Sequence, residues 1–317
     1  MTDCMPCRRA TLQRIVRLGL ACACLVLVSA QAAAARVAVV LSNDSTPYQE
    51  VYQVVRSLLD DSPHELSRLY AEKLTASSLE GAVLVVAVGV RAAEALGSLP
   101  SRSPVLAVLV PRAWYVETGR AGLSDSGRRS VSAIYLDQPF ERQAQLIRRA
   151  FPEVRRVGVL LSDDQGGLLG DLSEALRAQQ IDLLPGTLSS DGRLMPVLER
   201  VLSGAELLLA VADPLVFNRN TAQSLFLTTY RYRVPVMGYS RSLTRAGALL
   251  SLHSSPAQIG RQTAEWVIGA IQGASVRLPP PGYPAYFSVS INEQVARSLG
   301  FSLPTEAELE ARLGGGR

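Results

Sequence analysis

The chain has 317 residues, of which 48% are hydrophobic and 19% are charged. This composition is typical of a globular protein and excludes a disordered or fibrous one, and the length fits one large or two medium domains. The formal net charge is +4, but four arginines and one aspartate stand within the first 35 positions. The remainder is nearly neutral, so we expect no nucleic-acid partner.

The first 35 residues have the pattern of an export signal. Arginines up to Arg17 precede an apolar run over residues 18–30, and small residues follow up to Ala35. The run has about 13 residues, fewer than the roughly 20 that span a bilayer. We therefore predict a signal peptide over 1–35, cleavage near Ala35 and a periplasmic product. Lipid attachment at Cys22 or Cys24 is the alternative, although neither has a large aliphatic residue three positions before it.

All four cysteines lie inside this predicted signal, so we expect a mature protein without disulfides or thiol chemistry. Two histidines, His64 and His253, and one lysine, Lys73, remain for acid–base chemistry. Such a small set favours a protein that is not an enzyme and that has no metal or other cofactor.

Two patterns resemble parts of enzyme motifs. Residues 238–242 read Gly-Tyr-Ser-Arg-Ser after a predicted strand, as in a hydrolase nucleophile elbow, but the second glycine of that motif is missing. The glycines at 166, 167 and 170 do not complete a dinucleotide fingerprint, and Asp163 and Asp164 beside them would repel a pyrophosphate. A flexible loop explains these glycines better.

An internal repeat divides the chain into two similar halves. Residues 36–44 and 156–164 share six of nine residues at an offset of 120, and each segment is an apolar run that ends in a polar loop. Residues 81–88 resemble 204–211, and residues 104–108 resemble 235–239, in the same order. The order of these pairs predicts two lobes of the same architecture.

Continuous apolar runs of four to seven residues are typical of strands in a parallel sheet that helices cover on both faces. We predict strands at 37–42, 65–70, 83–88, 104–110, 131–136, 157–161, 181–186, 206–211, 234–238, 248–252 and 286–291. The segments between them supply helices, for example from Pro139 to Phe151, from the capping box at 255–258, and over 292–299. The predicted fold class is α/β, with two doubly wound parallel-sheet lobes.

Seven stretches, in this order and spacing, resemble the ABC-transporter substrate-binding family, which has the type I periplasmic binding protein fold, and especially its aromatic amino-acid receptors. They are 37–42, 137–152, 212–216, 234–238, 246–249, 259–264 and 288–304. The resemblance implies a hinge with three crossings, which we expect near Asp137, Gly247 and Pro279. It also implies an N-terminal lobe of 36–137 plus 248–278 and a C-terminal lobe of 138–247 plus 279–317.

Ligands of open parallel sheets bind beyond the carboxyl ends of the strands, so a cleft between the lobes is the predicted site. The residues expected there are Ser42, Asn43, Asp44, Tyr48, Gly89, Val90, Tyr135, Ser162, Asp163, Asp213, Asn218, Tyr239 and Ser240. Asp213 and Ser42 are expected to face each other and to hold the polar head of a solute. Helix capping is the alternative role for Ser42, Asp44 and Asp213.

One segment departs from the family that the chain resembles. After the strand at 104–110, many relatives carry Asp-Pro and then small residues, whereas residues 111–115 here read Pro-Arg-Ala-Trp-Tyr. Arg112, Trp114 and Tyr115 are therefore expected to reshape one wall of the cleft.

The resemblance implies a solute receptor that captures a small molecule, with amino acids among the candidates, and delivers it to an ABC permease. We expect a monomer that meets the membrane only through the permease. The alternative is a regulatory or assembly partner of the same fold without a transported solute. An open polar cleft favours the receptor, whereas an exposed apolar patch and a plugged cleft favour the alternative.

Overall fold

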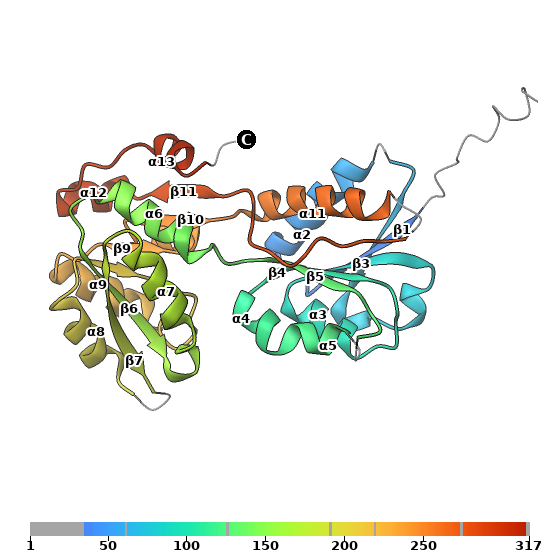
Figure 1. Ribbon diagram of the computed structural model, residues 1–317, viewed down its shortest axis with the longest axis horizontal. Helices are drawn as coiled ribbons and strands as arrows, with labels where there is room; N and C mark the ends of the chain where they lie inside the picture. Colours follow the sequence, from blue (N-terminus) through green and yellow to red (C-terminus); the bar gives the residue numbers. More distant parts are fainter. Residues whose placement is uncertain are drawn as a thin grey trace, which may run out of the picture.

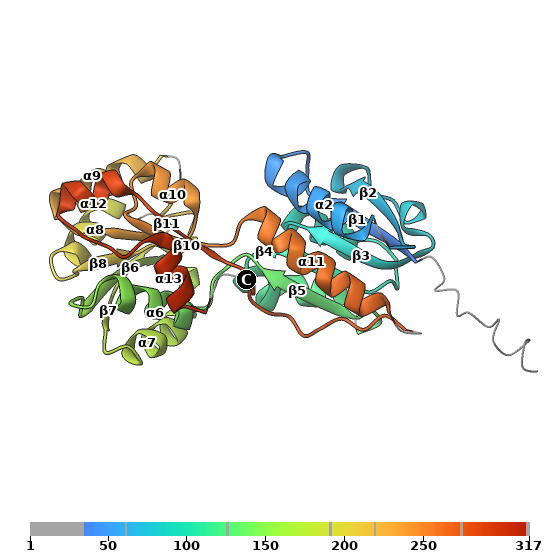
Figure 2. The ribbon, with the colours of Figure 1, turned by 90° about the horizontal axis from the view of Figure 1, so that it is seen from above.

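The computed structural model describes residues 35–60, 62–124, 127–189, 192–218, 220–272 and 275–314. Two α/β lobes lie beside each other along the long axis, and extended segments join them (Figures 1 and 2). Apart from Ala35, the predicted export signal lies outside the described residues, and so do all four cysteines. Across the described ranges, no helix combines the length and the apolar character that crossing a bilayer requires.

The first lobe is built on a parallel sheet with the strand order β2-β1-β3-β4-β5. Its strands are β1 (Arg36–Leu41), β2 (Glu65–Tyr70), β3 (Ala82–Val88), β4 (Val105–Val110) and β5 (Val131–Tyr135). The order reverses between β1 and β3, which makes this lobe doubly wound. Nearly all side chains of β1 and β3 are buried, as expected for strands that are covered on both faces.

Helices cover both faces of this sheet. On one face, α2 (Thr46–Leu59) packs against α11 (Pro256–Ile271), and Gly260 allows the close approach, since a Cβ there would lie 2.9 Å from Val54. On the other face lie α3 (Val90–Gly97) and a helix of three parts, α4 (Arg112–Trp114), the π-helical turn η3 (Tyr115–Gly119) and α5 (Arg120–Ser124). Short 3-10 turns, η1 (Ala71–Lys73) and η2 (Ser77–Leu79), connect β2 to β3.

The second lobe repeats this plan with the order β11-β10-β9-β8-β6-β7, in which only β11 runs antiparallel among the described strands. Its strands are β6 (Arg156–Ser162), β7 (Asp182–Leu188), β8 (Leu207–Leu209), β9 (Val236–Gly238), β10 (Leu250–His253) and β11 (Ser288–Ile291). The helices are α6 (Phe140–Ala150), α7 (Leu168–Arg177), α8 (Leu194–Leu202), α9 (Ala222–Arg231), α10 (Arg241–Ala246), α12 (Glu293–Leu299) and α13 (Glu306–Arg312), with the 3-10 turn η4 (Asp163–Gln165). The predicted fold class is confirmed, and the predicted strands lie within two residues of the observed ones at each end.

Two details of the predicted division are wrong. The strand expected at 248–252 was assigned to the first lobe, but β10 pairs with β9 and β11 and therefore belongs to the second sheet. The chain crosses to the first lobe only after it, at Ser254 and Ser255, rather than near Gly247. Residues 279–282 run along β5 of the first lobe, because Gly282 bridges to Ile134 and the Pro279 carbonyl accepts a hydrogen bond from Ser132, so the return crossing lies beyond Pro279.

Candidate inter-lobe binding site

A cavity of about 420 Å³ lies between the two lobes, beside the segments that join them. The first lobe contributes the segment after β4, the hinge contributes the segment after β5, and the second lobe contributes the ends of β8, β9 and β10. Carboxyl ends of parallel strands thus surround the cavity, as expected for a doubly wound fold. The lining is mostly apolar, with Pro111, Ala113, Trp114, Leu136, Phe140, Leu168, Ala210, Val211, Ala212, Pro214, Tyr239, Leu252 and Tyr283, and the polar members are Arg112, Glu117, Thr118, Asp137, Gln138, Gln143 and Gln165.

The wall of the first lobe is the helix that begins directly after Pro111. The backbone N–H of Arg112 donates to the Asp137 carboxylate at 2.6 Å, which ties this helix to the hinge. The π-helical turn that follows packs Gly119 against the Trp114 ring, since a Cβ at Gly119 would lie 2.5 Å from that ring. Arg112 and Trp114 line the cavity, so the segment that departs from the family forms this wall.

Polar side chains fix the hinge next to the cavity. Gln138 is buried and donates from its amide nitrogen to the Ser254 hydroxyl at 2.8 Å, and that hydroxyl donates to the Tyr286 carbonyl. The Arg142 guanidinium donates to the side-chain oxygen of Gln138 and to the Pro284 carbonyl. All three crossings are therefore linked to one another. Burial raises the pKa of the Asp137 carboxyl, and the hydrogen bond from Arg112 opposes this rise only in part.

Three tyrosines stack behind the first-lobe wall. The rings of Tyr135 and Tyr283 meet edge to face at 5.4 Å, and Tyr115 lies 5.7 Å from Tyr135. Burial raises the pKa of all three phenols, that of Tyr115 to about 12. Tyr283 lines the cavity, whereas Tyr115 and Tyr135 belong to the core of the first lobe.

On the second-lobe side, Asp213 is 1% exposed and its carboxylate is fully engaged. One oxygen accepts from the backbone N–H and the hydroxyl of Ser162, each at 2.6 Å, and the other accepts from the Leu215 N–H at 2.9 Å. Tyr239 lies at the cavity, edge to face with Phe217, and burial together with the nearby Asp213 charge raises its pKa.

The predicted site residues of the first lobe stand apart from the cavity. Ser42 is 3% exposed, donates to the Val88 carbonyl and accepts from the Ala92 N–H inside α3. Gly89 precedes that helix, Val90 begins it, and the Tyr48 ring packs against Gly89. The exposed Asn43 accepts from the Ser45 N–H, and the exposed Asp44 accepts from Gln49 and Tyr70.

In the second lobe, Ser240 caps α10 by accepting from the Leu243 N–H, and Asn218 accepts from two backbone N–H groups of its own loop. Asp163 is exposed in the turn after β6. Of the thirteen predicted residues, Tyr239 lines the cavity in this conformation, and the others stay predictions as ligand contacts. The sequence did not indicate five apolar or aromatic residues that line the cavity, because they come from separate segments that meet only in the folded structure. They are Leu136, Phe140, Leu168, Leu252 and Tyr283.

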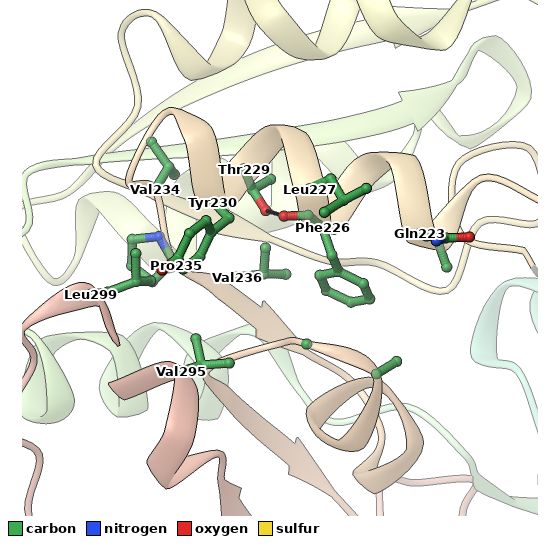
Figure 3. A pocket seen from close by; sticks show the side chains of 13 residues that line it. Gln223, Phe226, Leu227, Thr229, Tyr230, Val234, Pro235, Val236, Val295 and Leu299 are labelled. Carbon is green, nitrogen blue, oxygen red and sulfur yellow. Dashed lines mark hydrogen bonds between the residues drawn. The ribbon is translucent and has the colours of Figure 1, made fainter. Parts of the chain in front are cut away.

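A second hollow, of about 460 Å³, lies on the second lobe between α9 and α12, on the side away from the first lobe. Figure 3 shows Phe226 and Tyr230 on one side of it and Val295 on the other. Leu227 and Tyr230 are 61% and 51% exposed, and together they form a patch of exposed large side chains beside the hollow. We call this hollow the α9 groove.

Comparison with solved structures supports the fold. A domain in complex with L-Trp from Streptococcus pneumonia is 15% identical, with a TM-score of 0.59 over 89% of this chain and 99% of the other. The ligand-free, open structure of a substrate binding protein with adhesive properties from Clostridium difficile is 14% identical, with a TM-score of 0.67 over 86% and 96%. An ABC transporter substrate-binding protein from Desulfitobacterium hafniense in complex with Leu is 13% identical, with a TM-score of 0.51 over 75% and 83%.

A search of curated proteins found no match to this chain. The family model described as ABC transporter substrate binding protein matches residues 79–312, well over half of the sequence. Together with the two parallel-sheet lobes, this match means that the chain belongs to the ABC transporter substrate-binding protein family and has the type I periplasmic binding protein fold.

Proposed function

We propose that this protein captures a small solute with a large apolar body in the inter-lobe cavity and delivers it to an ABC permease. The family implies a small-molecule solute and a permease, and its members are typically periplasmic. The observation that carries the proposal is the open cavity lined by both lobes and the hinge, because its volume lies in the usual range for ligand pockets, about 300–1,000 Å³. Its lining is mostly apolar rather than polar as the sequence led us to expect, and this difference is why we propose a solute with a large apolar body.

Apolar amino acids are the first candidates for the solute. Two proteins of this fold are described as complexes with L-Trp and with Leu, and both ligands have apolar side chains. Trp114, Phe140 and Tyr283 line the cavity here and offer aromatic surface to such a body. The cavity also carries both signs of charge, on Arg112 and on Asp137 and Glu117, as a zwitterion requires.

The test is a thermal-shift screen of the mature protein against amino acids and small metabolites. A ligand at 100 times its Kd should stabilise the protein by about 2.7 kcal/mol. The variant Ala212→Trp, which fills the cavity from an exposed position, should lose that stabilisation. Ala178→Trp, on the exposed end of α7, should keep it. Stabilisation that survives Ala212→Trp would place the ligand elsewhere.

Closure of the lobes is the second readout. Each lobe has its own sheet and core, and three segments of the described chain cross between them, so we expect rigid-body closure on the ligand. Small-angle scattering with a saturating ligand should give a smaller radius of gyration than without it. An unchanged radius of gyration would contradict closure, and it would mean that the protein binds the ligand without moving its lobes.

A regulatory or assembly role without a transported solute is the second candidate, and the α9 groove favours it. Large apolar side chains exposed around a groove are typical of protein-binding surfaces. The double variant Leu227→Ser with Tyr230→Ser should then abolish the role in cells while ligand-induced stabilisation is kept. If transport is the function, Ala212→Trp should abolish it and the double variant should not.

A further inference from the structure

Arg112 lies where the two lobes face each other. It follows Pro111 at the end of β4, it lines the cavity, and its backbone is held by the Asp137 carboxylate. Its guanidinium forms an ion pair with Asp171 on α7 of the opposite lobe, with 3.5 Å between nitrogen and oxygen. The two side chains are 35% and 59% exposed, so the pair is weak and open to competition from a ligand.

The donors of this guanidinium are unused by the protein. In the part of the chain that the structure describes, Arg112 forms an ion pair with Asp171 alone and its guanidinium donates no hydrogen bond, although its charge also acts on the nearby Asp137 carboxyl. Two arginines that are buried or partly buried, Arg129 and Arg142, differ in this respect. Arg142 donates to Gln138 and to the Pro284 carbonyl, and Arg129 donates to three backbone carbonyls. Arg112 is therefore an arginine at a cavity with its planar fork of donors available.

We infer that Arg112 binds the carboxylate of a small, largely apolar organic acid, a class that includes the apolar amino acids, and that this carboxylate replaces Asp171 at the guanidinium. The inference rests on the proposed function and names the ligand class of the same cavity. An arginine fork matches a carboxylate with two parallel N–H···O bonds. Trp114, Phe140 and Tyr283, in the same lining, receive the apolar body.

The charges around the cavity agree with this assignment. The Asp137 carboxylate already accepts the backbone N–H of Arg112, and this hydrogen bond offsets part of its repulsion of an incoming carboxylate. Glu117 lines the cavity from an exposed position, where water screens its charge. Asp171 is the acid that competes directly with the ligand for the Arg112 guanidinium. Because Asp171 belongs to the other lobe, a ligand that breaks this ion pair also removes a contact between the lobes.

The first experiment compares two probes that share a ring and differ in charge, 3-phenylpropanoate and phenethylamine. The carboxylate should raise the Tm of the mature protein in a dose-dependent way, and the amine should not. Stabilisation by the amine alone, or by neither probe, overturns the assignment of Arg112. The proposed function fails separately, if no compound of the wider metabolite screen binds in the cavity.

The second experiment measures the Kd of 3-phenylpropanoate for three variants by calorimetry. Arg112→Gln should weaken binding roughly tenfold or more, because a hydrogen-bonded charge partner is lost. Asp171→Asn should tighten binding by up to about fivefold, because the competing acid is removed. Arg120→Gln removes the same charge from the same three-part helix outside the cavity lining and should leave Kd unchanged. If the Arg112 and Asp171 variants move Kd in the same direction, or if neither moves it, the inference is overturned.

Discussion

The two lobes begin with the same sequence pattern and finish their first strands in different ways. In the first lobe, the Ser42 N–H continues the sheet ladder to the Val88 carbonyl, and the Ser42 hydroxyl accepts from the Ala92 N–H inside α3. In the second lobe, the N–H and the hydroxyl of the equivalent Ser162 both donate to the Asp213 carboxylate. The repeat therefore keeps the serine and changes its partner.

The cause lies in the next crossover. In the first lobe, Gly89 is the one residue between β3 and α3, so the helix starts directly beside Ser42. In the second lobe, residues 210–221 separate β8 from α9, so α9 does not begin beside Ser162 as α3 begins beside Ser42. The Asp213 carboxylate supplies acceptors within that loop. A buried acid after a strand can thus fix the conformation of its own loop through hydrogen bonds. The residues of this loop that line the cavity, 210–212 and Pro214, are apolar.

In the second lobe, removal of the Asp213 carboxylate should have the largest effect on stability. Asp213→Ala removes the acceptor to which the N–H and hydroxyl of Ser162 and the N–H of Leu215 donate, and each buried hydrogen bond lost at Ser162 costs about 1–3 kcal/mol. We expect a loss of about 3 kcal/mol or more in the free energy of unfolding, measured by urea denaturation. Asp163→Ala, at an exposed acid in the next turn, is the control and should change stability by less than about 0.5 kcal/mol. Equal small effects would contradict the structural role.

Asp213→Asn separates this role from the ligand contact predicted from the sequence. Asparagine keeps one acceptor oxygen and replaces the other with a donor, which cannot satisfy Ser162 and Leu215 together. Unfolding should become easier by about 1–3 kcal/mol, and the affinity for a stabilising ligand should change little. A variant of unchanged stability that loses ligand affinity about thirtyfold would instead support contact between Asp213 and the solute.

In the first lobe, substitution of Gly89 should destabilise the contact between Ser42 and α3. Gly89 has a φ of +88°, and a Cβ there would lie 2.6 Å from the Ser42 hydroxyl oxygen and 2.9 Å from the Tyr48 ring. Gly89→Ala should cost about 1–3 kcal/mol, measured by denaturant unfolding. Gly170→Ala in α7 is the matched control, because nothing lies within 4 Å of its Cβ position and alanine favours a helix, so it should stabilise by up to about 1 kcal/mol. Two changes of the same sign would contradict this account.

The sequence predicted the strands well because a parallel strand that is buried on both faces must be apolar throughout, as Val37 to Leu41 and Val157 to Leu161 are. The capping box at Ser255 likewise follows from local chemistry, and the helix begins there. The assignment of β10 to the first lobe failed because the sequence of a short apolar strand does not show which strands it pairs with. Pairing with β9 and β11 decides its lobe.

The candidate site was harder to predict for a related reason. Polar residues after strands, such as Ser42 and Asp213, are equally suited to ligand binding and to satisfying backbone donors, and the sequence does not show which demand they meet. Leu136, Phe140 and Tyr283 have no polar signal, and they meet only because three separate segments cross at the hinge. The local features that correctly indicated cavity walls were Tyr239 at the end of β9 and the departure at Arg112 and Trp114.

The smallest expected effect concerns Asp137, a second acid that follows a strand, and it extends the comparison with Asp213. Asp137 follows β5 as Asp213 follows β8, but burial raises its pKa above the ordinary value of 3.8 in spite of the Arg112 N–H. The folded protein therefore resists ionisation of this group. As pH rises through the unfolded and then the folded pKa, wild type should lose stability relative to Asp137→Asn, which keeps an acceptor for Arg112 without the charge. The Tm of the ligand-free variant minus that of wild type should be more positive at pH 7 than at pH 3.5, by no more than about 3 °C. A difference that falls with rising pH would show that the folded protein stabilises the ionised carboxylate of Asp137, and it would contradict this prediction.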